Sequence, residues 1–567
     1  MSQSYNEKVY SEFNPIKISD IAKKIGIPAK YLKLYGDYTA KISTQYLDEK
    51  LSNKKNGKLI LMTSVTPTYY GEGKTVSAIG LSMALNKMGK KSIGCFSQAC
   101  LGGVFGLKGI STGGGYSQLM PAEELNLNFT GDTFAVEAAQ NLCAAALDNS
   151  FFWENKHGLD KALITWRRAV NINDRSMRNI TIGGGGKLHG ISRKSGADLT
   201  SVCECMAILS IAKDLKDLRE RIGKIVVGYT NKFVPITVDK IGVDGAMALI
   251  MKDAFSPNLV QTCEHTPCFV HGSSSGDVSD SSCSTVSQLL AVKLSDFAIV
   301  EADFGADLGA EKFFNIKSRQ SEITPSAAVI NCSVRALKIH SGDFTKKNML
   351  LPPELKREDL SAVDRGCSNL EKQVENLKMY GIPVIVNINR FETDSKKELD
   401  VIIKRAEALG VDGIAINESY KLGSAGSKDL ANEVIKVCKT EGSFRYLYPV
   451  DMPIKNKIER IAKSMYGASE IRYSDEADKS IDIIEKNKLD KKAICMGKTF
   501  LSLSSNPKKK GRPRGFVLNV DAVELFAGAN YIAVRCDGVN TIPGMVNKPR
   551  LDLMDYDVKT DKIKGLL

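Results

Sequence analysis

The stretch Thr66-Pro67-Thr68-Tyr69-Tyr70-Gly71-Glu72-Gly73-Lys74-Thr75 decides the fold of this chain. A phosphate-binding loop reads Gly-x4-Gly-Lys-Ser/Thr, and here Thr68 stands at the first glycine position while Gly73-Lys74-Thr75 complete the motif. In such a loop, backbone N–H groups cradle phosphate oxygens, the lysine supplies a charge to the β- and γ-phosphates, and the hydroxyl binds Mg²⁺. The motif predicts a nucleotide site, and the alternative is a glycine-rich turn that carries a surface lysine.

Strand and helix patterns on either side of this stretch predict a parallel sheet. Residues 59–65 form an apolar run typical of a buried strand, residues 75–88 carry apolar side chains at helical spacing, and residues 91–96 resemble the next strand. This β–loop–α–β unit is the building block of parallel sheets. Further strands are expected at 297–300, 327–330, 383–388 and 413–416, and helices at 206–221 and 399–409. We expect an α/β fold with a P-loop-type doubly wound parallel sheet.

The length of the chain indicates more than one domain, since 567 residues exceed what one core usually organises. Residues 454–465 have a helical pattern, and residues 493–504 and 515–536 read as strands with turns. We expect a large nucleotide-binding P-loop α/β domain at 1–370, a smaller α/β domain at 371–450 and a C-terminal α+β domain at 451–567.

The charge balance allows three classes of partner. Lys and Arg number 78 against 65 Asp and Glu, a net charge of +13, which suits nucleic acid, an anionic membrane or small anionic ligands. The basic run at 508–514 is a candidate nucleic-acid patch, but no aromatic residue interleaves with it, and a solvated loop is the alternative. No apolar run reaches the roughly 18–20 residues that span a bilayer. We expect small anionic ligands, no nucleic acid and no membrane.

The cysteines and the first residues indicate a cytoplasmic protein. The 13 cysteines have no framework spacing and match no zinc pattern well, so reduced thiols are expected. The segment at 1–7 lacks the charged and apolar regions of a secretory signal.

Several motifs, in order and spacing, resemble the formate–tetrahydrofolate ligase (10-formyltetrahydrofolate synthetase) family from about residue 15 to Leu567. The matching stretches are Thr66–Thr75, 105–109, 113–118, 126–132, 164–168, 173–175, 206–221, 257–262, 304–313, 389–391 and Pro543-Gly544. The resemblance implies that ATP phosphorylates formate to formyl phosphate. The amine of tetrahydrofolate then attacks the formyl carbon, which gives 10-formyltetrahydrofolate, with ADP and phosphate as the other products.

The resemblance also implies ligands, partners and site residues. ATP, formate and tetrahydrofolate are the small-molecule substrates, Mg²⁺ accompanies ATP, a monovalent cation (K⁺ or NH₄⁺) stimulates the reaction, and the assembly is a homotetramer. The ATP loop comprises Thr68, Tyr69, Tyr70, Gly71, Glu72, Gly73, Lys74 and Thr75, in which Lys74 is catalytic and Thr75 binds Mg²⁺. Phe391 matches an aromatic that sandwiches the pterin ring, and Tyr420 stands where the family usually has Trp, so the 371–450 domain supplies the folate-site aromatics.

Several ligand-facing positions depart from the family pattern. Ser97 stands at the position of a family arginine, which removes a planar cation suited to a phosphate or carboxylate. The other changes are Gln98 for Glu, Phe134 for His, Asp277 for Asn, Asp280 for His and Asp303 for Gly. The added carboxylates predict a more negative pocket, and they raise the question of whether Asp277, Asp280 and Asp303 form a metal site.

These departures leave three functional readings open. The chain is expected to be an ATP-dependent formate–tetrahydrofolate ligase. The alternatives are a diverged homologue that binds nucleotide but acts on another substrate, and a non-catalytic subunit. Cys100, in the altered loop, is a candidate reactive thiol or a small filler.

Overall fold

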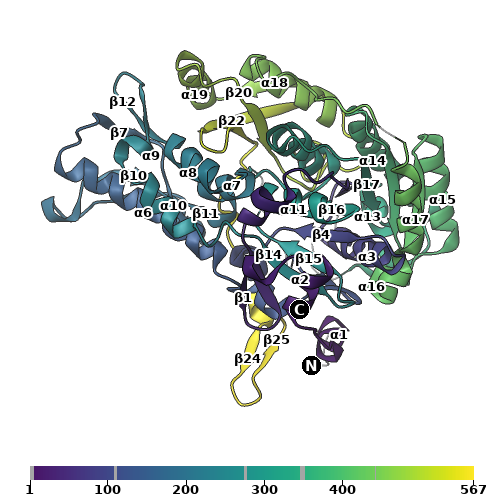
Figure 1. Cartoon of the computed structure of the whole chain (residues 1–567). Coiled ribbons are helices and arrows are strands. Elements are labelled where there is room, and N and C mark those ends of the chain that lie inside the picture. Colours follow the sequence, from purple (N-terminus) through teal and green to yellow (C-terminus); the bar gives the residue numbers. More distant parts are fainter. Residues whose placement is uncertain (1–4, 107–110, 274–277, 345–350, 441) are drawn as a thin grey trace.

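The computed structural model describes residues 5–106, 111–273, 278–344, 351–440 and 442–567 (Figure 1). One large sheet organises the fold, with its strands in the order β1-β2-β14-β15-β4-β16-β3-β17-β18-β19 and with β5 and β6 attached beside β14. The strands are β1 (Leu32–Tyr35), β2 (Thr39–Ile42), β3 (Lys58–Ser64), β4 (Ser92–Phe96), β5 (Gly113–Gly114), β6 (Ser117–Met120), β14 (Asn258–Thr262), β15 (Pro267–Val270), β16 (Phe297–Glu301), β17 (Ala327–Cys332), β18 (Val384–Asn389) and β19 (Gly413–Asn417).

The strands from β15 to β19 all pair in parallel, which confirms the expected parallel sheet. Strand β3 shows why both faces are covered, since Leu59 and Leu61 belong to one core while Ile60 and Met62 belong to the other. Side chains alternate between the faces of a strand, so an uninterrupted apolar strand needs a helical layer on each side.

Helices cover the two faces, as a doubly wound fold requires. The apolar side chains of α3 (Lys74–Lys87) and α17 (Lys428–Val437) pack into the core that contains Ile60. Those of α11 (Thr285–Leu294), α14 (Leu360–Lys378) and α15 (Lys396–Ala408) pack into the core that contains Leu59. The remaining helices near the sheet are α2 (Ile18–Lys24), α4 (Leu101–Val104), α5 (Ala122–Asn126), α12 (Arg319–Ser321), α13 (Val334–His340) and α16 (Ser419–Leu422).

An insertion between β6 and β14 extends to the left of Figure 1. It contains the long helix α6 (Asp132–Trp153) and several short strand pairs. Its other elements are β7 (Leu159–Ile164), β8 (Arg168–Val170), β9 (Ile180–Ile182), β10 (Arg193–Ser195), β11 (Ala197–Leu199), α7 (Glu204–Ile211), α8 (Leu215–Lys224), β12 (Val226–Thr230), β13 (Pro235–Thr237), α9 (Val238–Ile241) and α10 (Asp244–Met251).

The expected helix over 206–221 is wrong as a single element. Helix α7 ends at Ile211, and α8 begins at Leu215. The side chain of Asp214 accepts a hydrogen bond from the Asp217 backbone N–H over 2.7 Å, so it caps a new helix. An aspartate that caps a helix in this way marks a start, which the apolar periodicity across 206–221 conceals.

The tail forms a second sheet in the order β20-β22-β23-β21, with α18 and α19 above it in Figure 1. The elements are α18 (Ile454–Ile461), β20 (Ala468–Tyr473), α19 (Asp475–Lys486), β21 (Ala493–Gly497), β22 (Phe516–Phe526) and β23 (Tyr531–Cys536). The expected boundary at residue 370 lies inside α14, and β18 and β19 continue the large sheet. The division into three domains stays a prediction.

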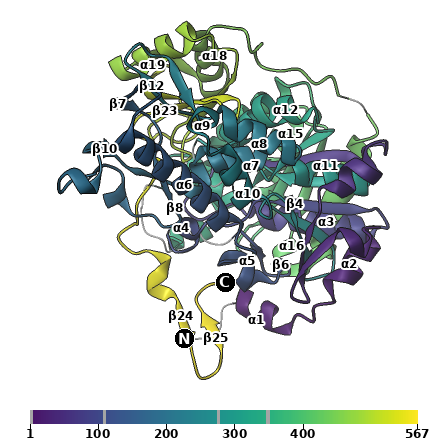
Figure 2. The same ribbon diagram turned by 60° about the vertical axis from the view of Figure 1, so that its left-hand side comes forward.

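Helix α1 (Tyr5–Glu12) lies near the last residues of the chain in both views (Figures 1 and 2). The helix contacts the end of the chain through Glu7, whose carboxylate accepts a hydrogen bond from the Gly565 N–H over 3.1 Å. The hairpin of β24 (Asp555–Asp557) and β25 (Lys562–Lys564) projects from the body beside this helix. Among the described helices, none has the length and apolar character needed to cross a bilayer.

Candidate active site

The phosphate-loop motif lies between β3 and α3, as the sequence predicts. Gly73 precedes α3 with φ 72°, in the left-handed region, and a side chain there would collide with the amide of Asn389. Only glycine meets both conditions without strain, so this position is fixed by the turn and by the packing. The α3 helix begins at Lys74, which leaves its first backbone N–H groups available at the carboxyl edge of the sheet.

Glu72 braces the loop from within. Its Oε1 accepts hydrogen bonds from the Thr68 N–H over 2.8 Å and from the Thr68 hydroxyl over 2.7 Å, and its Oε2 accepts one from the Ser333 hydroxyl over 2.8 Å. The Glu72 backbone oxygen accepts a bond from Asn331 over 2.6 Å. The side chain is buried in the loop, whereas the neighbouring Tyr69 is largely exposed. Both carboxylate oxygens of Glu72 are thus used to hold the phosphate loop in shape.

The chemistry-bearing side chains of the loop converge on Glu301, at the end of β16. The Thr75 hydroxyl donates to Glu301 Oε1 over 2.8 Å, and Lys74 Nζ lies 3.6 Å from the same oxygen. Lys74 also donates to the backbone oxygens of Ala302 and of Phe304, the latter over 3.4 Å. Burial raises the pKa of Glu301, while Lys74 and Thr75 oppose this shift. A cation, a hydroxyl and a carboxylate thus meet beside the loop that would hold phosphates.

The other predicted site residues follow parallel strands at the same edge. Ser97 and Gln98 follow β4, Phe391 follows β18 and Tyr420 follows β19, and Glu301, which the sequence did not single out, ends β16. These strands belong to the parallel run β4-β16-β3-β17-β18-β19, so their carboxyl ends share one edge of the sheet. That edge is where open α/β sheets bind ligands.

Gln98 is a buried amide without a side-chain partner. Its backbone N–H donates to the Gly272 oxygen over 2.6 Å, and the residue is 2% exposed. Both Oε1 and Nε2 lack a hydrogen-bond partner in the part of the chain that the structure describes. A buried amide left unpaired is costly, so this side chain is suited to a polar ligand.

The expectation that Asp280 makes the pocket more negative is wrong, because this carboxylate is neutralised inside the protein. Asp280 forms an ion pair with Lys317, and both side chains are at most 1% exposed. Lys317 Nζ also donates to the Ser210 backbone oxygen over 2.7 Å. Burial raises the pKa of Asp280, and Lys317 opposes this.

Of the remaining departures, Asp303 lies beside the segment that carries Asp280, since its backbone N–H donates to the Ser281 oxygen over 2.8 Å. Phe134 is exposed on the first turn of α6, Asp303 follows Glu301, and Asp277 lies outside the described residues. Within the described ranges, no group of three His, Cys, Asp or Glu side chains gathers to hold a metal. The described residues therefore give no support to a metal site at Asp280 and Asp303.

The two predicted folate aromatics lie on adjacent loops that ion pairs connect. Arg390 pairs with Glu418 over 3.4 Å, and Lys421 pairs with Glu392 over 2.8 Å. One face of the Phe391 ring is covered, since the guanidinium carbon of Arg335 lies 3.7 Å from its centroid.

Tyr420 packs against the first helix of the chain. Its ring centroid lies 5.6 Å from that of Tyr5, and its hydroxyl donates to the Asn6 side chain over 3.2 Å. Asn6 also accepts a hydrogen bond from the Gly115 N–H over 2.8 Å. Helix α1 therefore forms one wall beside this aromatic.

Arg335, on α13, is a site residue that sequence reasoning missed. Besides covering Phe391, it donates to the backbone oxygen of Tyr70 over 3.0 Å and to that of Gly71 over 2.5 Å. It joins the phosphate loop to the predicted folate aromatic. A lone arginine in an ordinary helical pattern does not indicate this role in the sequence. Glu301 could have been found, because a carboxylate at the end of a buried strand is a recognisable pattern.

Two other candidate features are structural. Cys100 is buried, burial raises the pKa of its thiol, and it is a small filler rather than a reactive group. In the basic run, Arg512 pairs with Glu375 over 2.5 Å, and Lys510 donates to the Leu501 oxygen over 2.9 Å. These two of the five basic side chains in the run are thereby engaged within the protein.

Two comparisons show which known proteins this chain is similar to. A family model described as formate–tetrahydrofolate ligase matches residues 5–567. A formate–tetrahydrofolate ligase of Pseudothermotoga lettingae is 43% identical to this chain over 549 residues, which cover 97% of each of the two chains.

Proposed function

The chain belongs to the formate–tetrahydrofolate ligase family, and from this premise we propose how its site carries out the ATP-dependent ligation of formate to tetrahydrofolate. The enzyme joins formate to tetrahydrofolate with ATP as the energy source. The alternatives of another substrate or a non-catalytic role are not favoured, because the 43% identity extends over 97% of both chains. The observation that carries the proposal is the convergence of Lys74 and Thr75 on Glu301 at the carboxyl edge of the sheet.

In the first step, a formate oxygen attacks the γ-phosphorus of ATP, a P–O bond forms, and ADP leaves. The backbone N–H groups of the loop hold the phosphate chain, and Lys74 stabilises the charge that builds on the transferred group. Thr75 and Glu301 would hold Mg²⁺, since a hydroxyl and a part-buried carboxylate 2.8 Å apart are hard oxygen ligands of the kind that Mg²⁺ prefers. When bound, Mg²⁺ neutralises the phosphate oxygens.

Formate lies beside Gln98 in this proposal. The amide has a donor and an acceptor without partners among the described residues, and formate or its formyl phosphate offers complementary oxygens. Gln98 thus supplies a neutral donor near the position where the family has an arginine and this chain has Ser97. We expect weaker binding of formate than a cation would give, without loss of the reaction.

In the second step, the tetrahydrofolate amine attacks the formyl carbon, a C–N bond forms, phosphate leaves, and the amine loses a proton. Phe391 and Tyr420 hold the pterin ring by stacking. Because Arg335 covers one face of Phe391, the pterin takes the other face or displaces the guanidinium. The same arginine donates to the phosphate loop, which supports one connected site for the two substrates.

Three further properties belong to the proposal. A monovalent cation, K⁺ or NH₄⁺, stimulates the reaction, as the family resemblance implies. The chain assembles as a homotetramer, as the family resemblance implies. The location is cytoplasmic, which fits the absence of a disulfide among the cysteines that the structure describes.

The test is a matched pair of lysine substitutions on α3. Lys74→Met is expected to lower kcat/KM for ATP by about 100-fold or more, because it removes a preorganised cation from the phosphate site. Lys87→Met removes a lysine of the same helix that is 66% exposed, and it is expected to leave turnover unchanged. Equal activity of the two variants would contradict the assignment of the phosphate site.

A further inference from the structure

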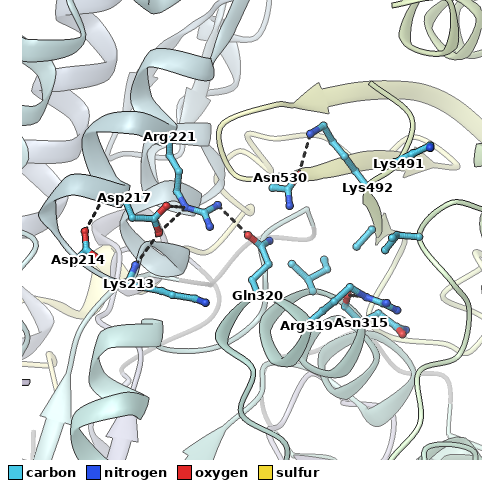
Figure 3. Close-up of a pocket in the computed structure, with 13 residues that line it drawn as sticks. Lys213, Asp214, Asp217, Arg221, Asn315, Arg319, Gln320, Lys491, Lys492 and Asn530 are labelled. Carbon is cyan, nitrogen blue, oxygen red and sulfur yellow. Dashed lines mark hydrogen bonds and ion pairs between the residues drawn. The ribbon is translucent and has the colours of Figure 1, made fainter. Parts of the chain in front are cut away.

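A second charged cavity lies away from the carboxyl-edge site, between the insertion and the C-terminal sheet. Its volume is about 370 Å³, which is within the range of small-ligand sites. Figure 3 shows Lys213, Asp217 and Arg221 on one side and Lys491 and Lys492 on the other, with Arg319 on a third element. None of the residues that line it belongs to the site proposed for ATP, formate or folate.

The cavity has an excess of positive charge. Five cationic side chains line it, Lys213, Arg221, Arg319, Lys491 and Lys492, against the two carboxylates of Asp214 and Asp217. Asp217 is engaged with Arg221 over 2.9 Å, and Lys213 pairs with Glu322 over 3.1 Å. In the part of the chain that the structure describes, Arg319, Lys491 and Lys492 have no carboxylate partner, so three cations remain to be neutralised.

The cationic groups are held in place by the protein. The Arg319 guanidinium lies 3.8 Å from the Tyr446 ring centroid and donates to the backbone oxygens of Asn315 over 3.1 Å and Tyr448 over 2.8 Å. Arg221 donates to Gln320 over 2.9 Å, and Lys492 donates to Asn530 over 2.9 Å. Side chains that are fixed before binding lose little entropy when a ligand arrives.

The lowered pKa values of two cations in the cavity favour an anionic ligand. Burial lowers the pKa of Lys492, and the nearby charges of Lys224 and Arg221 lower it further against the opposing effect of Glu204. Burial also lowers the pKa of Arg319. An anion in the cavity would relieve both effects, and it would connect the α8 and α12 segments with the loops of the C-terminal sheet.

We propose that this cavity binds the diphosphate group of a small molecule at a site distinct from the active site. Arginine matches phosphate oxygens through its planar fork, and lysine contributes a point charge, so a fixed arginine with two lysines suits a compact, multiply charged phosphate. The group comes either from inorganic pyrophosphate or from a nucleoside diphosphate. Binding of either molecule at this cavity does not require ATP turnover, so it is independent of the ligase reaction.

Calorimetric titration of pyrophosphate into the full-length protein tests the proposal. Lys74→Met serves as the background, because it weakens phosphate binding at the active site. Adding Lys491→Ala and Lys492→Ala is expected to weaken pyrophosphate binding at least tenfold. The matched control adds Lys508→Ala and Lys509→Ala, which remove two exposed lysines of another loop, and it is expected to change affinity less than twofold.

The arms of the experiment separate the possible outcomes. Tighter binding of ADP than of pyrophosphate, lost in the same double variant, assigns a nucleotide, and equal or weaker binding of ADP assigns the inorganic ion. Citrate binding as tightly as pyrophosphate would overturn the phosphate class. No binding to the background, or an equal loss in both double variants, would overturn the site. Because the comparison uses two variants on one background, its failure would not bear on the role of Lys74.

Discussion

The Thr75 hydroxyl donates a hydrogen bond of 2.8 Å to the Glu301 carboxylate, although the two residues are 226 positions apart in the chain. The contact exists because β3 and β16 are adjacent parallel strands that end at the same edge. It places a part-buried carboxylate beside the hydroxyl that binds Mg²⁺ in phosphate-loop motifs.

Glu301→Gln is expected to raise the Mg²⁺ concentration needed for half-maximal ATP binding by roughly 10-fold or more. The substitution removes a charged oxygen that binds Mg²⁺ directly or through a bound water. Calorimetric titration of ATP at several Mg²⁺ concentrations measures this without turnover. Asp296→Asn changes an exposed carboxylate just before the same strand, and it is expected to have no effect. An unchanged Mg²⁺ requirement in Glu301→Gln would remove Glu301 from the site.

Arg335→Met is expected to raise KM for both ATP and tetrahydrofolate by about 3-fold to 30-fold. The substitution removes the stacking of the guanidinium on Phe391, for which cation–π energies of about 0.5–2 kcal/mol apply, and the two hydrogen bonds to the phosphate loop. Steady-state kinetics with each substrate varied in turn measures both values. Arg390→Met removes an exposed arginine beside Phe391, and an equal effect there would contradict a specific coupling.

Asp280→Asn is expected to destabilise the protein by about 3–5 kcal/mol, because it leaves Lys317 buried without its counterion. Replacing both residues, as Asp280→Asn with Lys317→Met, is expected to recover part of this loss. Thermal unfolding midpoints of the purified variants test this prediction, with the midpoint of the double variant expected between those of Asp280→Asn and the unchanged protein. Glu470→Gln breaks an exposed pair with Arg472 and serves as the control, with an effect near zero.

Glu204→Gln is expected to weaken the pH dependence of stability above pH 6.5. Burial raises the pKa of Glu204 from 4.5 to about 8. Between these values the folded state holds a proton that the unfolded state has lost, so the stability contribution falls as pH rises, by up to about 1.4 kcal/mol per pH unit.

The control for this prediction comes from a second buried glutamate. Glu311 also has a pKa raised to about 8 by burial, so Glu204→Gln should reduce the slope by about half rather than abolish it. His271 and His340, whose pKa values burial lowers from 6.5 to about 4, are neutral in the folded state but still bind protons in the unfolded state near pH 6.5. This contribution is the same with and without the substitution, so the reduction by half applies to the part of the slope that the two glutamates supply. Thermal midpoints at pH 6.5, 7.0, 7.5 and 8.0 measure the slope, and an unchanged slope would contradict the assignment.

The sequence predicts the parts of the site that are local in the chain. The strand, loop and helix around Lys74 follow from spacing over some 30 residues, and the parallel sheet follows from repeated apolar runs. The roles of Glu301 and Arg335 depend on which strands become neighbours, and one chain's periodicity does not encode that order. The ion pair of Asp280 with Lys317 escapes sequence reasoning for the same reason, since the family pattern alone made Asp280 a ligand-facing carboxylate.

The most direct test of the whole account follows an oxygen atom. The purified protein is supplied with ATP, Mg²⁺, K⁺, tetrahydrofolate and formate labelled with ¹⁸O, and the products are analysed by mass spectrometry. Because a formate oxygen attacks phosphorus, we predict 10-formyltetrahydrofolate together with phosphate that carries one ¹⁸O atom per turnover. Product accompanied by unlabelled phosphate, or no product from a protein that binds ATP, would contradict the proposed reaction at this site.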